Sequence, residues 1–263
     1  MDLGLRDKIA MVAGGSRGLG FAVAQALAAE GARVSLGSSD GSRCQEAARR
    51  LEQESGARTM GMKADLRSGA EIAAWHAATE QQLGKVELLF INSGGPPAGA
   101  FSAFEEAAWR DAFELLVLGA IRLARTVMPG MMERGRGAIL VSTSSSVKEP
   151  IANLTLSNVL RPSVAALAKS LAAEGASRGV RVNQLIPGRI ATDRIQHLDT
   201  VNSQRLGISR EEQERRMKGN IPLGRYGQPE EFGRAAAFLL SGAASYITGA
   251  TLQVDGGMIR TLM

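Results

Sequence analysis

Three glycines near the amino terminus have the spacing of a phosphate-binding turn. Gly14, Gly18 and Gly20 lie between a short apolar run at 9–13 and an Ala-rich pattern of helical spacing. Gly14 allows a sharp turn, Gly18 lets the backbone approach a phosphate, and Gly20 permits close packing of helix on strand. The helix start would offer unpaired N–H groups and a positive dipole end to a pyrophosphate. The sequence therefore predicts a nucleotide-binding strand–turn–helix unit.

Four later segments complete a recognisable pattern with this Gly-x-x-x-Gly-x-Gly loop. They are Asp65-Leu66, Asn92-Ser93-Gly94-Gly95, Pro187-Gly188-Arg189-Ile190-Ala191-Thr192, and Ile247-Thr248-Gly249-Ala250 through Val254-Asp255-Gly256-Gly257. In this order they resemble the short-chain dehydrogenases/reductases, most closely the 3-oxoacyl-(acyl carrier protein) reductase-like branch. The resemblance covers nearly the whole chain. It implies a carbonyl/alcohol oxidoreductase that binds a nicotinamide dinucleotide and a small-molecule substrate, and that assembles as a homotetramer or homodimer.

The resemblance and the glycine loop together assign a set of cofactor contacts. The expected residues are Gly14, Ser16, Arg17, Gly18, Leu19, Gly20, Ser38, Ser39, Asp65, Leu66, Asn92, Ser93, Gly94, Arg161, Pro187, Gly188, Ile190 and Thr192. Sites that select NAD place a carboxylate at the end of the second strand, where it would repel a 2′-phosphate. This chain has Gly37-Ser38-Ser39 there and Arg17 in the glycine loop. We therefore expect NADP(H) to be favoured over NAD(H).

The catalytic positions implied by the resemblance carry unusual residues. The family uses a Tyr and a Lys one helical turn apart, a Ser at the end of the fifth strand, and an Asn on the preceding long helix. The segment 163–171 matches what normally follows the Lys, which places Ser157 at the Tyr position and Arg161 at the Lys position. Ser144 has the family's spacing before Ser157, and the Asn would fall near Leu116. Ser144, Ser157 and Arg161 are thus the candidate catalytic residues.

These replacements change the chemistry that the site can perform. A Ser hydroxyl is much shorter than a phenol and has no pKa near neutrality, so Ser157 cannot replace Tyr as a proton donor. Arg161 stays protonated and cannot relay protons as Lys does, but it can donate fixed hydrogen bonds to ribose hydroxyls. Lys148 is an alternative proton donor, with a solvent-exposed Lys paired to Glu149 as the competing interpretation, and His197 is another alternative. Either His197 acts, or it is simply exposed.

Pro162 lies between the candidate catalytic positions and the helical pattern at 163–177. Inside a helix it would remove the hydrogen bond to the carbonyl of Asn158, at a cost of about 3 kcal/mol, whereas at a helix start it costs little. We therefore predict a kinked or late-starting helix here. A late start would also put in doubt the one-turn separation of Ser157 and Arg161.

Apolar runs and helical patterns alternate along nearly the whole chain, which predicts one doubly wound, Rossmann-type α/β domain at 1–263 with a seven-stranded parallel sheet. The predicted strands are Ile9–Ala13, Arg33–Leu36, Thr59–Lys63, Val86–Ile91, Ala138–Val141, Val180–Ile186 and Thr251–Val254. The predicted helices are Gly18–Glu30, Ser42–Gln53, Gly69–Leu83, Phe104–Arg134 and Ser163–Ser177.

The segment 191–220 interrupts this alternation with polar, Arg-rich sequence. Loops at the carboxyl ends of strands flank the ligand crevice of such sheets, so one interpretation is a lid over the substrate. The other is a surface helical hairpin with no substrate role. Substrate contacts are expected from this segment together with 94–101 and 147–155, and their identity is not fixed by the sequence.

Composition narrows the remaining classes. The chain has 263 residues, one cysteine and two histidines, which excludes an internal disulfide and a Cys/His zinc site, so no metal site is predicted. The amino terminus lacks a secretory pattern, no run of about 18 apolar residues is present, and a cytoplasmic protein without membrane partners is expected. The net charge of +5 comes from scattered basic residues, which favours a solvated surface over nucleic-acid binding.

Two functions remain open at this point. The first is an NADP(H)-dependent oxidoreductase with an atypical proton donor. The second is a nucleotide-binding protein that has lost turnover and acts as a sensor or as an assembly partner. The missing Tyr, Lys and Asn favour the second function, while the glycine loop and the Pro-Gly segment suit both.

Overall fold

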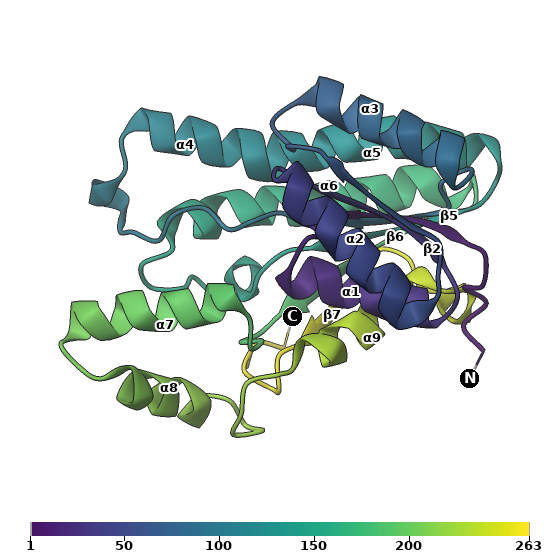
Figure 1. Cartoon of the computed structure of the whole chain (residues 1–263). Coiled ribbons are helices and arrows are strands. Elements are labelled where there is room, and N and C mark those ends of the chain that lie inside the picture. The colour runs from purple at the N-terminus through teal and green to yellow at the C-terminus, as the bar shows by residue number, and fades with distance from the viewer. Residues whose placement is uncertain (1, 263) are drawn as a thin grey trace.

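Seven parallel strands form the centre of the computed structural model, which describes residues 2–262 (Figure 1). The strand order is β3-β2-β1-β4-β5-β6-β7. The strands are β1 (Ile9–Ala13), β2 (Arg33–Ser38), β3 (Thr59–Lys63), β4 (Leu88–Ile91), β5 (Gly137–Ser142), β6 (Val180–Pro187) and β7 (Thr251–Val254). The predicted sheet is confirmed, and no strand end differs from its prediction by more than two residues.

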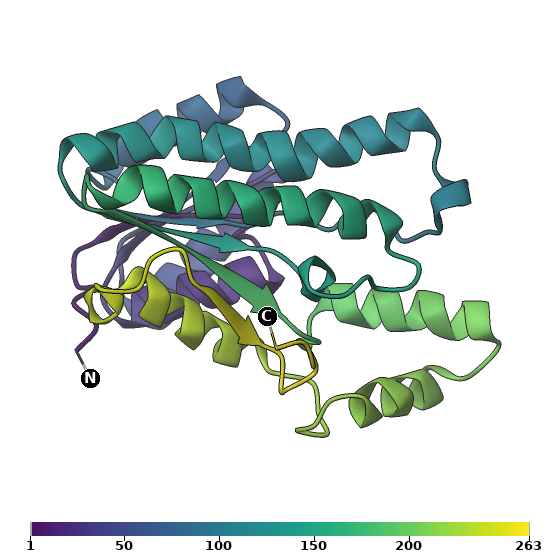
Figure 2. The same cartoon turned by 180° about the vertical axis from the view of Figure 1, so that it is seen from behind.

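Helices cover both faces of the sheet (Figures 1 and 2). Those of the described chain are α1 (Gly18–Ala29), α2 (Gly41–Ser55), α3 (Gly69–Gln82), α4 (Glu106–Phe113), α5 (Gly119–Glu133), α6 (Thr155–Ala176), α7 (Asp193–Leu206), α8 (Arg210–Gly219) and α9 (Pro229–Leu240). The helices α3, α5 and α6 pack on one face, and α1, α2 and α9 pack on the other. The result is one Rossmann-type domain.

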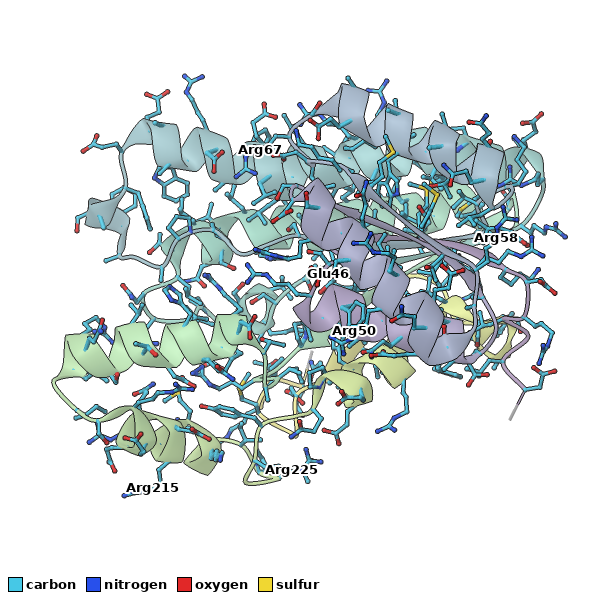
Figure 3. The ribbon with its side chains drawn as sticks, in the orientation of Figure 1. Glu46, Arg50, Arg58, Arg67, Arg215 and Arg225 are labelled. Atoms are coloured by element: carbon cyan, nitrogen blue, oxygen red, sulfur yellow. The ribbon has the colours of Figure 1, made fainter. Side chains whose placement is uncertain are left out.

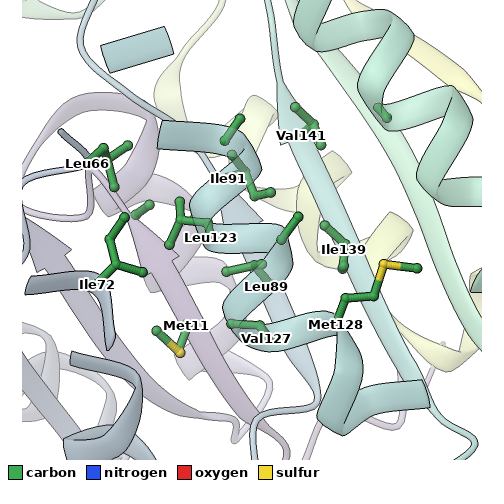
Figure 4. Close-up of a cluster of buried hydrophobic side chains, with 14 of the residues drawn as sticks. Met11, Leu66, Ile72, Leu89, Ile91, Leu123, Val127, Met128, Ile139 and Val141 are labelled. Atoms are coloured by element: carbon green, nitrogen blue, oxygen red, sulfur yellow. The ribbon is translucent and has the colours of Figure 1, made fainter. Parts of the chain in front are cut away.

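The strands are apolar because both of their faces are buried. Met11 of β1 packs with Ile72 and Val127 in the core under α3 and α5, which Figure 4 shows in close-up. Its neighbour Val12 points the opposite way and packs with Leu27 in the core under α1 and α9. Side chains alternate between faces along a strand, so a continuous apolar run supplies both cores.

The strand order reverses between β1 and β4, and this point sets the place of the ligand crevice. Ala10 and Val12 of β1 pair with β2 on one side and with β4 on the other. The chain leaves β1 and β4 toward opposite halves of the sheet, which opens a crevice beyond their carboxyl ends. The glycine loop at 14–20 follows β1, and Asn92 follows β4, so both lie at this reversal.

The predicted late start of the helix around Pro162 is wrong. Helix α6 begins at Thr155, and Pro162 lies inside it. The first two turns are held by tertiary contacts that offset the lost hydrogen bond: Leu156 and Leu160 are buried, and the Asn158 side chain bonds both the N–H and the carbonyl of Ile151, at 3.0 and 2.8 Å. Ser157 and Arg161 therefore lie one helical turn apart.

The long helix predicted at Phe104–Arg134 is interrupted by one π-helical turn, Glu114–Leu118, between α4 and α5. The stretch Glu106–Glu133 has the length and apolar composition of a membrane span, but half of its most apolar window is buried inside the domain. Burial of this kind is the property of a core helix. The π-helical turn is a local widening of the helix, a feature that is frequent at functional sites.

Helix α9 was not predicted, and 191–220 forms two helices rather than an irregular loop. The start of α9 does carry a sequence signal, because Pro229 occupies its first turn and Glu231 forms a capping box with Gln228. Its apolar face, with Phe232 and Ala236, packs on α1. The Ala-rich composition between two glycine-rich segments concealed this periodicity.

Basic residues are distributed over many elements of the surface (Figure 3). Arg67 forms a two-pronged ion pair with Asp111, at 2.6 and 2.8 Å. Arg225 pairs with Glu231 at 2.7 Å, and its hydrogen bonds lower the pKa of that carboxyl to about 2. This scattered and partly paired arrangement is the one expected of a solvated surface.

Candidate functional site

One cavity of about 1040 Å³ lies at the carboxyl ends of the strands. It is lined by the turns after β1, β2, β3, β4, β5 and β6 and by parts of α6 and α7. Every predicted cofactor and catalytic residue except Gly20 lines it. This volume is at the upper end of the range for small-molecule and cofactor sites. The structure thus brings together residues that are up to 178 positions apart, from Gly14 to Thr192.

The glycine loop has the geometry of a phosphate cradle. Gly14 and Gly18 have φ of +61° and +56°, a region that side chains other than glycine rarely adopt. A Cβ at Gly18 would meet only the methyl group of Thr192, at 3.8 Å, so this stretch of backbone faces open space. The first residues of α1 carry no side-chain cap and no acidic group. The unpaired N–H groups at the start of α1 fit an anionic phosphate.

Gly20 supports the cradle from beneath. A Cβ at Gly20 would lie 2.1 Å from the carbonyl oxygen of Gly14, far inside any real contact. Helix α1 therefore packs against its own entry turn, as predicted for this glycine. Gly14 in turn lies against Asn92, whose Nδ2 would be 2.7 Å from a Cβ at Gly14 and donates to the Ala13 carbonyl at 3.4 Å.

The end of β2 is positively charged at the cavity. Asp40 is the N-cap of α2, and its carboxylate accepts from the Arg43 N–H at 3.0 Å and pairs with the Arg43 guanidinium at 3.5 Å. Arg17 and Arg43 both line the cavity and are half or more exposed, and Ser38 and Ser39 lie between them in the lining. Arg43 was missed from the sequence because it lies within α2, three residues beyond the segment considered.

The candidate catalytic residues lie close together between β5 and α6. Arg161 is 8% exposed, and its Nη1 donates to the Ser142 carbonyl at the end of β5, at 3.2 Å. Ser144 accepts the N–H of Ser146 at 3.1 Å, which leaves its own hydroxyl proton free to donate. The Ser157 hydroxyl is buried and lies 3.5 Å from the Ser146 hydroxyl. Two hydroxyls and one guanidinium therefore face a single wall of the cavity.

Burial changes the ionisation of Arg161. Desolvation, with a smaller contribution from the nearby positive charge of Arg194, lowers the pKa of Arg161 to about 10. Arg161 is therefore still charged at neutral pH. Its Nε is buried without a hydrogen-bond partner. Among residues 2–262 it has no carboxylate within 4.0 Å, so the cavity holds an uncompensated charge.

Neither tyrosine of the chain replaces the absent phenol. Tyr226 does not line the cavity, and its hydroxyl donates to Asp199 at 2.8 Å. Burial is the main cause that raises the pKa of Tyr226 to about 12, so it keeps its proton. Tyr246 is fully exposed next to η4 and also lies outside the cavity lining.

The position expected for the family's Asn lies in the π-helical turn. Leu116 is 3% exposed and packs in the core, while its neighbour Leu115 lines the cavity. The helix keeps a widened turn here, but it presents an apolar side chain to the cavity instead of an amide. Lys148 is absent from the cavity lining, and the described residues show no ion pair between it and Glu149. His197 lines the cavity and is exposed.

Helices α7 and α8 lie side by side beyond the carboxyl ends of the strands (Figures 1 and 2). Thr192, Arg194 and Leu198 of this segment line the cavity, as do Met217 and Asn220 from α8 and its end. The surface-hairpin interpretation is therefore incomplete, because the hairpin also forms one wall of the site. Arg194 donates to the Pro96 carbonyl at 2.8 Å, and sequence reasoning missed it.

A buried ion pair anchors α7 to the rest of the domain. Asp199 of α7 is 3% exposed and accepts hydrogen bonds from Arg189 and from Tyr226. We expect Asp199→Asn to lower the free energy of unfolding by about 3–5 kcal/mol, because it leaves the buried charge of Arg189 unpaired. Urea unfolding measures this change. Asp193→Asn, on the same helix, is the control: its pair with Arg17 is exposed at 3.7 Å, and a change above about 1 kcal/mol there would contradict the argument.

Comparison with known proteins agrees with this geometry. The family model described as enoyl-(acyl carrier protein) reductase matches residues 13–259. The 3-oxoacyl-[acyl-carrier-protein] reductase of Escherichia coli is 34% identical over 258 residues, covering 97% of this chain and 99% of the relative. The chain belongs to the short-chain dehydrogenase/reductase family of oxidoreductases and is similar to its 3-oxoacyl-carrier reductases.

Two solved structures are similar over nearly their whole length. The L-sorbose reductase of Gluconobacter frateurii, complexed with NADPH and L-sorbose, has a TM-score of 0.94 and 31% identity, with both chains fully covered. A short chain oxidoreductase of Pseudomonas aeruginosa PAO1, bound to NADPH and described as containing an atypical catalytic center, has a TM-score of 0.88 and 31% identity, covering 98% of this chain and 99% of that one.

Proposed function

We infer that this protein is an NADP(H)-dependent oxidoreductase that interconverts a carbonyl and an alcohol with Arg161 and Ser144 in place of the usual Tyr and Lys. The observation that carries this inference is the position of a charged, buried Arg161 in the same cavity as an intact phosphate cradle. NADPH-bound relatives support a nicotinamide cofactor, and the relative described as atypical in its catalytic center shows that such a site occurs in the family.

The chain's own residues have separate roles in this proposal. When bound, the nicotinamide supplies or accepts the hydride. Ser144 donates its free hydroxyl proton as a hydrogen bond to the substrate oxygen and orients it. Arg161 stabilises the negative charge that develops on that oxygen, which is strongest in a buried site, and its other N–H groups hold the ribose. Solvent water supplies the proton that balances the transferred hydride.

Turnover by the unmodified protein tests the proposal. NADPH binding is measured by fluorescence, and its oxidation is followed with a panel of ketones, ketoacyl thioesters and quinones. We expect NADPH-dependent reduction of at least one class, and a Ser157→Tyr/Arg161→Lys variant shows whether restoring the family residues raises the rate. Binding without turnover across the panel would contradict the proposed reaction for those substrates.

A second candidate function has one specific observation in its favour. Both tyrosines lie outside the cavity, so no phenolic donor is available in it. A nucleotide-binding sensor or assembly partner needs the cradle but no proton donor. The same experiment separates the two functions, because a sensor binds NADPH without oxidising it. A homotetramer or homodimer and a cytoplasmic location remain predictions that follow from family resemblance and composition.

Cofactor preference has its own prediction. Arg17 and Arg43 border the end of β2, where the 2′-phosphate of NADP(H) would lie, and we expect NADPH to bind more tightly than NADH. Charge-assisted hydrogen bonds to phosphate contribute about 1.5–3 kcal/mol each, so Arg43→Ala should weaken NADPH binding about tenfold or more and leave NADH nearly unchanged.

Dissociation constants for both nucleotides measure this preference. Arg49→Ala, on the exposed face of the same helix and outside the cavity, is the matched control and should change neither constant. Equal or tighter binding of NADH by the parent protein would overturn the preference.

A further inference from the structure

Two arginines share one end of the cavity without a carboxylate to neutralise them. Arg161 extends from α6, and Arg194 extends from the first turn of α7; both line the cavity, and each lowers its exposure by packing on backbone. Arg194 lies over Gly95, where a Cβ would be 2.9 Å from its Nη2, and donates to the Pro96 carbonyl at 2.8 Å. Arg161 bonds only the Ser142 carbonyl, at 3.2 Å.

The acidic residues of the cavity do not compensate this pair. Asp40, Asp65 and Asp193 line its outer parts, and each lies beside another arginine, at 3.5, 3.5 and 3.7 Å respectively. Glu149 lines the cavity but is exposed to solvent. Within residues 2–262, neither Arg161 nor Arg194 has a carboxylate within 4.0 Å.

Burying such charges is costly unless a ligand pairs with them. Desolvation lowers the pKa of both arginines, and the charge of Arg194 also lowers that of Arg161. The Nε of Arg161 is buried and has no acceptor. Planar guanidinium groups bind carboxylates and phosphates through paired hydrogen bonds, so an oxyanion placed between these two would satisfy the open donors and neutralise the repulsion.

We propose that Arg194 and Arg161 form an anion subsite for the substrate, which therefore carries a carboxylate or phosphate group near its carbonyl. This inference rests on the proposed function, because it places the substrate against the cofactor in the same cavity. The cofactor's own phosphates are the other possible source of the anion. They are assigned to the start of α1 and the end of β2, whereas Arg194 contacts the segment after β4.

Matched pairs of charged and neutral carbonyl compounds test the subsite. Binding of acetoacetate and methyl acetoacetate, and of dihydroxyacetone phosphate and dihydroxyacetone, is measured calorimetrically with and without saturating NADPH. We expect at least one anion to bind tenfold or more tightly than its neutral partner. Arg194→Met should abolish that preference, and Arg194→Lys should retain part of it, while Arg205→Met, an exposed residue of the same helix outside the cavity, should leave it intact.

The outcomes are distinguishable from failure of the proposed function. Anion preference that depends on Arg194 but without NADPH oxidation supports the subsite and contradicts the reaction. Equal binding of charged and neutral partners in both pairs, or no binding of either anion, overturns the subsite. An Arg194→Met variant that loses NADPH affinity by the same factor as anion affinity also overturns it, because the anion would then belong to the cofactor.

Discussion

Arg161→Met is expected to make the protein more stable and less able to bind NADPH. In the free protein Arg161 has a charged, buried guanidinium with one acceptor and an unpartnered Nε. The lowered pKa of about 10 corresponds to a cost of about 3 kcal/mol for keeping this charge inside the domain. An unbranched apolar side chain removes the cost, so the free energy of unfolding should rise by about 1–3 kcal/mol. NADPH affinity should fall about tenfold or more, with loss of turnover.

The pH dependence and a second arginine provide the controls. The folded-state pKa of about 10 lies below the usual value of 12.5, so the cost is fully present below pH 10 and disappears as the pH rises above it. The gain from Arg161→Met should therefore be constant from pH 6 to 9 in urea unfolding. Arg181→Met should have the opposite sign, because that guanidinium donates to four carbonyls, including those of Leu239 and Ser241 at the end of α9. A loss of stability in Arg161→Met would refute the argument.

Gly20→Ala is expected to abolish nucleotide binding and to destabilise the domain severely. The added Cβ would lie 2.1 Å from the Gly14 carbonyl oxygen and 2.7 Å from its carbonyl carbon. Both atoms are backbone at the reversal point of the sheet, so α1 must move away from its entry turn. Overpacking of this kind costs about 1–3 kcal/mol or more. The displaced helix start would no longer direct its N–H groups at a phosphate.

Circular dichroism during thermal unfolding and NADPH fluorescence measure the two effects. Gly219→Ala, at the end of α8, is the matched control: nothing lies within 4 Å of its added Cβ. Alanine is the better helix former by about 1 kcal/mol, so this control should not destabilise the protein. Normal NADPH affinity in Gly20→Ala would show that the loop does not hold the cofactor.

Local patterns predicted the sheet and the cradle because their physical signals are contained in short segments. The run Ile9–Ala13 is apolar at every position since both faces of β1 are buried, and Gly14, Gly18 and Gly20 encode the turn directly. The family resemblance placed Ser157 and Arg161, and the structure brings them into the cavity. Their binding and catalytic roles stay predictions until ligands are tested.

What the sequence did not reveal depends on tertiary placement. Pro162 lies inside α6 because the packing of Leu156 and Leu160 outweighs its local penalty, and no local rule contains that packing. Arg194 appeared as one of many charged residues in a polar segment, and only the fold puts it beside Arg161. The contact of Asp199 with Tyr226 spans 27 positions and likewise has no short-range signal.

The contact between Gly14 and Asn92 means that the phosphate-binding turn is already assembled before any nucleotide arrives. Two neighbouring strands hold its ends, and α1 closes beneath it through Gly20. Dinucleotide capture by this half of the cavity therefore loses little chain entropy, and preorganisation of this kind favours rigid-body docking over induced fit.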